Sequence, residues 1–310
     1  MMGTGNTGGT FLTRFYTVVC AAFKSLRDAT SIAFNQTTKL LLNAGACGGA
    51  PGITLLQMAI SAAIGGASPF GLRLTEYTPL PNREAAYDTA VLGALVTAGI
   101  GTLNACIGLM HVSLVMVLRS TEPALVLVLA HCMLPASQLP SPAKAAAILP
   151  VVVGAALSAS GAHAPSASGI ALALVCNGCS ALRGIQSKRI GAKFKTDPSS
   201  EWFHICVSGT ALQTAYILAS DLVFATPLPT LPPRALATTA LASGAAYFAH
   251  MQLSWLCLGR MLAVSHSLCN SLRRPVTILA ALLYAPMAFS PLNSCGIAFA
   301  CGGAVLYGLL

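Results

Sequence analysis

The segment that decides the fold is SHSLCNSLRRPVTILAALLYAPMAF, residues 265–289, an apolar run interrupted by Arg273, Arg274 and Pro275. A charged side chain at the centre of a bilayer costs about 2.5–3.5 kcal/mol on insertion scales, and proline removes a hydrogen bond from a helix. A membrane helix that keeps all three residues is therefore expected to use them. The segment indicates a membrane protein that keeps positively charged side chains within an apolar span because they have a function.

The composition of the whole chain also indicates a membrane protein. Hydrophobic residues make up 55% of the 310 residues, charged residues only 8%, and the mean hydropathy is +0.74. Apolar stretches of about 20 residues alternate with short breaks rich in Gly, Pro, Ser or charge, which is typical of consecutive spanning helices. The chain is predicted to be an all-α integral membrane protein, with residues 1–310 forming a single domain.

Ten transmembrane helices are predicted. The first is the most polar, because it contains Asp28, Asn35, Gln36 and Lys39, and a nine-helix arrangement is its main competitor. The predicted spans are 28–47, 51–70, 89–109, 112–134, 143–161, 167–189, 200–223, 235–258, 262–287 and 290–310.

The basic residues in the loops support ten spans, because short cytoplasmic loops collect Lys and Arg. With a cytoplasmic N-terminus, only Arg234 falls on the outer side. The basic residues on the inner side are Arg14, Lys24, Arg27, Arg73, Arg83, Lys144, Lys188, Arg189, Lys193, Lys195 and Arg260. The net charge of +9 thus reflects topology, and its scatter over loops argues against a nucleic-acid partner.

Several basic residues remain inside or at the edge of predicted spans, where only Glu122 and Asp221 could neutralise them. Uncompensated arginines in a membrane favour a cavity that holds positive charge until an anionic ligand binds. The alternative, which applies most to the residues near span ends, is that the long side chains reach the headgroups. The residues concerned are Lys39, Arg119, Arg183, Arg273 and Arg274.

An internal repeat links two of these sites. Residues 112–123 read VSLVMVLRSTEP and residues 264–275 read VSHSLCNSLRRP, so Val-Ser and Pro recur at the same separation with arginine shortly before the proline. These segments are the fourth and ninth predicted spans. A second copy of a five-helix unit must enter the membrane inverted, so we predict two inverted five-helix repeats, about 28–161 and about 167–310. Substrate sites in such transporters lie near the midplane, where the repeats meet.

The chain resembles the plastidic phosphate translocators, in the sugar-phosphate and nucleotide-sugar branch of the drug/metabolite transporter superfamily. The resemblance is clearest at HVSLVMVLRSTEPAL, ALRGIQSKRIGA and VSHSLCNSLRRPVTI. It implies a secondary antiporter that exchanges a phosphorylated organic anion, such as a sugar phosphate, for inorganic phosphate in an organelle membrane such as the plastid envelope. It implies neither an enzyme nor a cofactor.

The residues that bind phosphate in this family fall on basic residues of this sequence. A lysine before Glu-Pro in the fourth helix falls on Arg119, and an arginine before Ser-Lys in the sixth falls on Arg183. The ninth-helix pattern of His, Asn and Lys-Arg falls on His266, Asn270, Arg273 and Arg274. The resemblance therefore implies that these basic residues bind the phosphate.

The chain also departs from the family. A family histidine and threonine fall on Ile100 and Leu103, and an eighth-helix tyrosine falls on His250. Two lysines of the family are replaced by arginines in this sequence. The exchange keeps the positive charge but replaces a compact ammonium by a planar guanidinium. His250 and His266 are either pH-sensitive ligand contacts or hydrogen-bonded interior histidines. The particular substrate therefore stays open.

Other functions are weighed against this one. A nucleotide-sugar antiporter of the Golgi or endoplasmic reticulum would share the fold and the anion site. A channel or structural membrane protein would not need charge at equivalent positions of two repeats. The sequence has no metal cluster, P-loop or catalytic triad, and Cys176 and Cys179 are interpreted as packing residues. The sequence does not distinguish a monomer from a homodimer.

Overall fold

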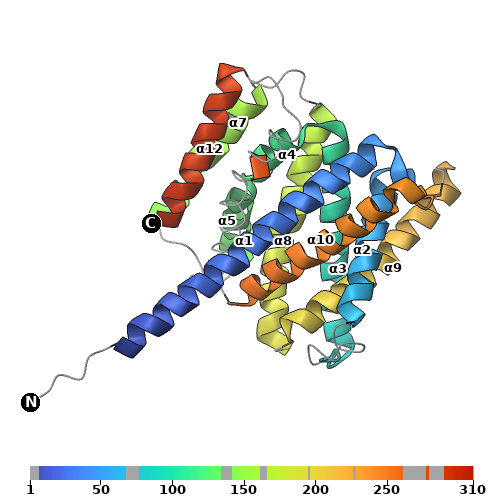
Figure 1. Cartoon of the computed structure of the whole chain (residues 1–310), viewed down its shortest axis with the longest axis horizontal. Coiled ribbons are helices and arrows are strands. Elements are labelled where there is room, and N and C mark those ends of the chain that lie inside the picture. The colour runs from blue at the N-terminus through green and yellow to red at the C-terminus, as the bar shows by residue number, and fades with distance from the viewer. Residues whose placement is uncertain are drawn as a thin grey trace, which may run out of the picture.

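The computed structural model describes residues 7–67, 77–133, 142–160, 166–194, 196–225, 228–260, 277–278 and 290–309, and in these ranges every regular element is a helix (Figure 1). The helices are α1 (Thr7–Asn43), a 3-10 turn η1 (Ala46–Gly48), α2 (Ala50–Gly66), α3 (Arg83–Leu109), α4 (Val112–Arg119), α5 (Glu122–Met133), α6 (Pro142–Ala146), α7 (Leu149–Ser160), α8 (Ala167–Phe194), α9 (Pro198–Phe224), α10 (Arg234–Arg260) and α12 (Pro291–Leu309).

These helices follow the predicted spans, except that residues 262–287 lie almost entirely outside the described residues. By length and composition, three helical stretches of the described chain could cross a membrane: α3, the 112–133 stretch formed by α4 and α5, and α8. α2 and the 149–158 part of α7 are shorter apolar helices. The all-helical class is confirmed, whereas the complete set of ten spans stays a prediction.

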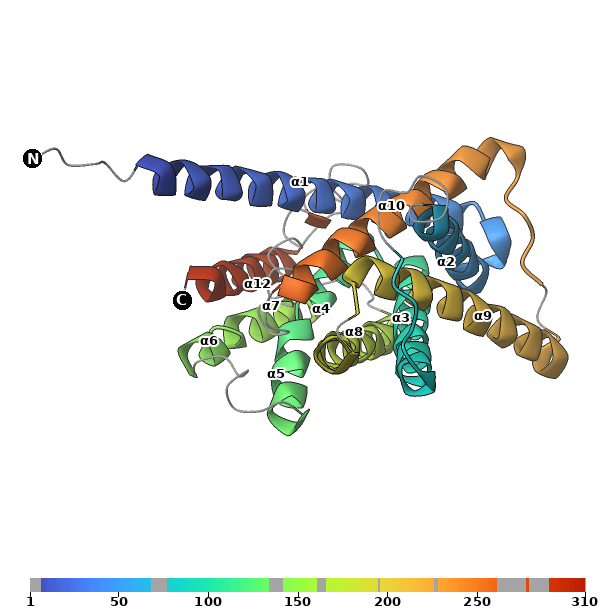
Figure 2. The ribbon, with the colours of Figure 1, turned by 90° about the horizontal axis from the view of Figure 1, so that it is seen from below.

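The first helix is longer than predicted. It begins at Thr7 rather than near residue 28, and it ends at Asn43, shortly before Gly45 adopts a left-handed conformation with φ 62°. The sequence from residue 7 to residue 28 contains no proline to stop the helix. Its N-terminal half extends away from the other helices (Figures 1 and 2). At 37 residues and 1.5 Å per residue the helix is about 55 Å long, more than a bilayer core requires.

The predicted fourth span is interrupted just before Pro123. α4 ends at Arg119 and α5 begins at Glu122, and the amide of Thr121 donates to the carbonyl of Leu118 at 3.2 Å. The side-chain amide of Asn177, on α8, donates to that same carbonyl at 3.0 Å and to the hydroxyl of Thr121 at 3.0 Å. A broken helix is tolerated within a membrane when neighbouring side chains satisfy its backbone. The helix is therefore interrupted next to the proline, and Asn177 of α8 satisfies the backbone at the interruption.

A fully buried polar cluster joins α1, α2, α3 and α10. Gln57 donates to the hydroxyls of Thr38 at 2.9 Å and Ser243 at 3.0 Å. Asn104 donates to the hydroxyl of Thr54 at 2.9 Å and to the side-chain carbonyl of Gln57 at 2.9 Å. All five side chains are 0% exposed. Because a polar group in a dry interior requires partners, this cluster fixes how the four helices approach one another.

The helix pairs form a regular pattern of contacts. α3 packs along α8 and α9, and α10 packs along α1 and α2. α2 also contacts α9, and α7 contacts α12. Figure 1 shows α7 and α12 side by side at one edge of the molecule, with α3, α8 and α10 nearer the centre.

α7 and α12 approach closely enough for their backbones to touch. A methyl group at Gly296 would overlap the backbone nitrogen of Ser158, and one at Gly154 would overlap the backbone nitrogen of Ala300. The side-chain amide of Asn293 also donates to the carbonyl of Ser158 at 2.9 Å. Small residues that allow backbone contact are a usual means of helix association in membranes.

We expect Gly296→Ala to destabilise the folded protein by about 1–3 kcal/mol, because the added methyl group overlaps backbone that cannot rotate away. Gly302→Ala, on the same helix, is the matched control, since a methyl group there meets nothing within 4 Å. Both substitutions gain the same helix propensity, so their difference isolates the overlap. Thermal unfolding in detergent measures the effect, and equal melting temperatures would contradict the close approach.

Candidate functional site

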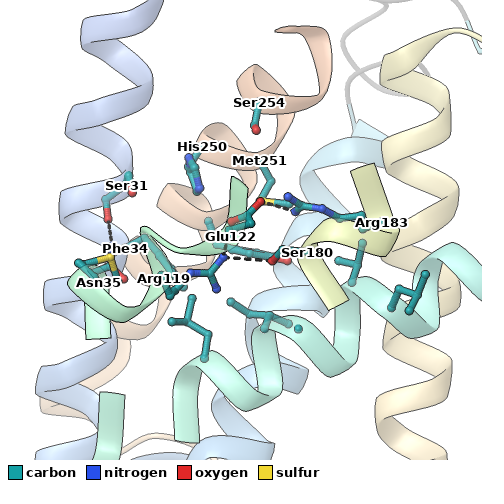
Figure 3. Close-up of a pocket in the computed structure, with 17 residues that line it drawn as sticks. Ser31, Phe34, Asn35, Arg119, Glu122, Ser180, Arg183, His250, Met251 and Ser254 are labelled. Atoms are coloured by element: carbon teal, nitrogen blue, oxygen red, sulfur yellow. Dashed lines mark hydrogen bonds and ion pairs between the residues drawn. The ribbon is translucent and has the colours of Figure 1, made fainter. Parts of the chain in front are cut away.

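A cavity of about 70 Å³ lies at the centre of the helices, and side chains from α1, α3, α4, α5, α8 and α10 line it (Figure 3). Its polar wall combines arginines, a carboxylate, an amide, hydroxyls and an imidazole. The lining residues are Ser31, Phe34, Asn35, Leu95, Val96, Gly99, Ile100, Leu103, Met116, Arg119, Glu122, Ser180, Arg183, Tyr247, His250, Met251 and Ser254.

Arg119 lies at the end of α4, beside the helix interruption, and is held by several partners. Its guanidinium donates to the carboxylate of Glu122 at 3.3 Å, to the hydroxyl of Ser180 at 3.1 Å and to the sulfur of Cys176. Glu122 is 3% exposed. The expectation that Glu122 could neutralise one arginine is therefore met at Arg119, which is both a cavity residue and half of an ion pair.

Arg183, on α8, has a different environment. Its guanidinium lies 3.8 Å from the sulfur of Met251 and 5.8 Å from the ring centroid of Trp255, and its buried Nε has no hydrogen-bond partner. No carboxylate lies within ion-pair distance of it in the described part of the chain. Figure 3 shows Arg183 reaching the cavity from α8. Its side chain turns inward to the cavity rather than toward headgroups.

His250 and Lys39 were both predicted as ligand-binding residues, and the structure places them differently. His250 lines the cavity, is 8% exposed and stacks on Phe34 with ring centroids 6.5 Å apart. Lys39 is not a lining residue, because its ammonium donates to the carbonyls of Ile107 at 2.7 Å and Met110 at 3.3 Å. It thereby caps the C-terminal end of α3, where a cation is favoured.

The remaining predicted site residues, His266, Arg273 and Arg274, lie outside the described residues. The cavity therefore shows the α4 and α8 arginines of the predicted anion site, together with His250. Ile100 and Leu103 also line it, so the positions at which the chain departs from the related translocators border the same space.

The sequence interpretation missed the polar residues that complete the cavity wall: Ser31, Asn35, Ser180, Tyr247 and Ser254. Small polar side chains are common in membrane helices, where most of them bond to their own backbone. The polarity of the first predicted span was the available signal, although of its polar residues Asp28, Asn35, Gln36 and Lys39 only Asn35 lines the cavity.

The charges of the described wall are unbalanced. Two guanidiniums face one carboxylate: Glu122 forms an ion pair with Arg119 and lies beyond ion-pair distance of Arg183, so the described wall carries an excess positive charge. No group of three metal-binding side chains occurs among the described residues. Arginine guanidiniums bind phosphate or carboxylate through two parallel hydrogen bonds, so the arrangement suits an anion.

The apolar helices and the central cavity lined by arginines place the chain among the membrane proteins whose several helices surround a polar site. The chain belongs to the Triose-phosphate Transporter family, whose model matches residues 26–308. A solved crystal structure shares the fold with a TM-score of 0.63 and 18% sequence identity, over 94% of this chain and 97% of that chain.

The chain is similar to several plant proteins of this kind. It is 26% identical over 266 residues to a triose phosphate/phosphate translocator of non-green plastids from Brassica oleracea, which covers 82% of this chain and 64% of the relative. It is 25% identical over 239 residues to phosphoenolpyruvate/phosphate translocator 1 of Arabidopsis thaliana, covering 73% and 57%. It is 27% identical over 242 residues to the xylulose 5-phosphate/phosphate translocator of Arabidopsis thaliana, covering 74% and 56%. The matches thus span less than two thirds of each relative.

Proposed function

We propose that the chain is a secondary antiporter that exchanges a phosphorylated organic anion, such as a sugar phosphate, for inorganic phosphate across an organelle membrane of the plastid-envelope type. Membership of the Triose-phosphate Transporter family and the names of the similar translocators support this proposal. The observation that carries it is the excess positive charge of a central cavity in which the guanidiniums of Arg119 and Arg183 share one described carboxylate, that of Glu122. Excess positive charge inside a membrane protein is costly unless a ligand supplies the negative charge.

The helices support the proposed pair of inverted repeats within one domain. If α1, α2, α3 and α6–α7 correspond to α8, α9, α10 and α12, the contact of α3 with α8 becomes that of α10 with α1. The contact of α3 with α9 likewise becomes that of α10 with α2. The pairs α2–α9 and α7–α12 each map onto themselves. These pairings are thus unchanged when the repeats are exchanged, as an internal two-fold axis requires.

The proposed transport mechanism follows from the cavity's charge. One repeat rocks against the other around the site, and access changes from one side of the membrane to the other. An empty cavity with excess positive charge crosses the apolar midplane unfavourably, whereas a bound anion neutralises it. Strict exchange follows, because each inward or outward step needs an anion in place. In this proposal Arg273, Arg274 and His266 of the ninth span add to the grip on the phosphate.

The proposal is tested with purified protein in liposomes preloaded with inorganic phosphate. Uptake of labelled phosphate, sugar phosphates and nucleotide sugars from outside is measured against liposomes without internal phosphate. We expect saturable uptake of phosphate and of a phosphorylated small anion, with dependence on the internal anion. Uptake of nucleotide sugars alone would assign the site to that transporter class, and unsaturable flux without counter-substrate would indicate a channel.

The proposed orientation gives a separate prediction: Lys193 and Arg234 lie on opposite sides of the membrane. Lys193, at the end of α8, forms an ion pair with Glu84 at the start of α3, and both ends are assigned to the cytosolic side, as are the termini. At the other side, the loops that contain Gly48 and Pro229 lie in contact. Cysteines introduced at Lys193 and Arg234 should react with an impermeant maleimide from opposite faces of sealed vesicles. Labelling of both from one face would contradict ten spans.

A further inference from the structure

Two buried polar atoms on the cavity wall, neither of them on an arginine, have no hydrogen-bond partner within the described part of the chain. They are the side-chain oxygen of Asn35, on α1, and the hydroxyl of Tyr247, on α10. Both residues are 2% exposed. Buried polar groups are nearly always hydrogen-bonded, and an unsatisfied one costs about 1–3 kcal/mol. Other buried atoms of the described chain also lack partners, among them the side-chain oxygens of Asn104 and Asn293, but the Asn35 and Tyr247 atoms belong to the cavity wall, where a ligand is able to supply the partner.

The orientation of the Asn35 amide is fixed by its own helix. Its nitrogen donates to the backbone carbonyl of Ser31 at 2.7 Å, as Figure 3 shows. A carbonyl only accepts hydrogen bonds, so the nitrogen must be on that side and the oxygen must be the unsatisfied atom. The Asn35 oxygen is therefore a hydrogen-bond acceptor on the cavity wall, and it requires a donor from the ligand.

Tyr247 is positioned by aromatic contacts. Its ring lies 5.4 Å from that of Phe34 and 6.0 Å from that of Trp202, measured between centroids. These contacts hold the ring, while the hydroxyl can rotate its hydrogen to donate or to accept. Tyr247 can therefore either donate a hydrogen bond to a ligand hydroxyl or accept one from it.

We propose that Asn35 and Tyr247 form a subsite that recognises the hydroxyl groups of a hydroxylated phosphate ester, and that the chain prefers sugar phosphates to phosphoenolpyruvate. The inference rests on the proposed function, since the arginines bind the phosphate while this subsite forms hydrogen bonds with the hydroxyl groups of the carbon chain. A sugar hydroxyl donates to the Asn35 oxygen and exchanges a hydrogen bond with Tyr247. Phosphoenolpyruvate has no hydroxyl, and its carboxylate would bring acceptor oxygens against an acceptor.

The preference follows from the cost of unsatisfied groups. A site built to bond a ligand hydroxyl rejects an analogue without it, because the protein groups then stay buried and unpaired. A site that merely tolerates the carbon chain would not discriminate in this way. The expected discrimination is about tenfold for each lost hydrogen bond.

The test measures KM for xylulose 5-phosphate, phosphoenolpyruvate and inorganic phosphate in the liposome exchange assay. The wild-type protein should favour xylulose 5-phosphate over phosphoenolpyruvate. Asn35→Leu and Tyr247→Phe, which remove the polar atoms at similar size, should each raise the KM for xylulose 5-phosphate about tenfold relative to that for phosphate. The ratio of the KM values for phosphoenolpyruvate and phosphate should change much less.

Asn293→Leu is the matched control. Asn293 is also a buried amide whose nitrogen donates to a helix carbonyl and whose oxygen is unpaired, but it lies between α12 and α7 and does not line the cavity. It should alter stability without altering the KM ratios. A wild-type preference for phosphoenolpyruvate, or an equal change for all substrates in Asn35→Leu and Tyr247→Phe, would overturn the subsite. Absence of any phosphate exchange by the wild type would instead reject the proposed function.

Discussion

Replacement of Arg183 by methionine is expected to lower anion exchange about 100-fold or more, while the protein stays folded at wild-type stability or above it. The guanidinium lies against Met251 and Trp255 and has no carboxylate within ion-pair distance in the described ranges. A methionine of similar length suits these neighbours and removes the cost of burying a charge. Function and stability should therefore change in opposite directions.

Counterflow uptake of labelled phosphate and thermal unfolding in detergent measure the two effects of Arg183→Met. Arg189→Met serves as the control, because Arg189 lies on the same helix with an exposed side chain. Arg183→Lys should be intermediate, since it keeps the charge but loses the planar fork. Wild-type exchange by Arg183→Met would show that this arginine does not contact the anion.

A second large effect is expected at Arg119, with the reverse pattern. Arg119→Ala should destabilise the protein by about 1.5–3 kcal/mol, because the buried carboxylate of Glu122 loses one charged partner, the guanidinium at 3.3 Å. Ser180 loses its contact with the guanidinium as well. Exchange should also fall, but together with the amount of folded protein.

A double-mutant cycle separates the ion pair from the anion site. Adding Glu122→Gln to Arg119→Ala should restore much of the lost stability, because the carboxylate is then neutral, whereas exchange should stay low. Thermal unfolding of the two single variants and the double variant gives the coupling free energy. Additive effects, or an Arg119→Ala variant as stable as the wild type, would show that the pair is not structural.

The sequence predicted the arginines of the site because charge in an apolar span is rare and costly. Arg119 and Arg183 were both found in this way, and both line the cavity. The distinction between them was beyond the sequence, because it depends on which helix faces which. Arg119 has Glu122 one turn away on the adjoining helix, while Arg183 faces the sulfur and ring of α10.

Lys39 and Asn35 show a second limit. Both are polar residues of one predicted span and lie one turn apart, yet Asn35 lines the cavity and Lys39 caps α3. Hydropathy reports that a residue is polar but not which partner satisfies it. Helix α1 begins well before the predicted span for a related reason, since hydropathy marks the apolar part of a helix and not its full hydrogen-bonded length.

The contact of α7 with α12 has a mechanical consequence. Helices that touch through backbone at Gly154 and Gly296 cannot slide past one another without forcing main-chain atoms together, but they can still tilt about the point of contact. This pair lies at one edge of the molecule, away from α2 and α3 (Figure 1). In the proposed rocking motion, this contact would act as a pivot, and small rotations there would produce larger displacements at the helices around the cavity. A covalent bridge between α7 and α12 at this contact should therefore be tolerated, whereas one across the cavity should stop exchange.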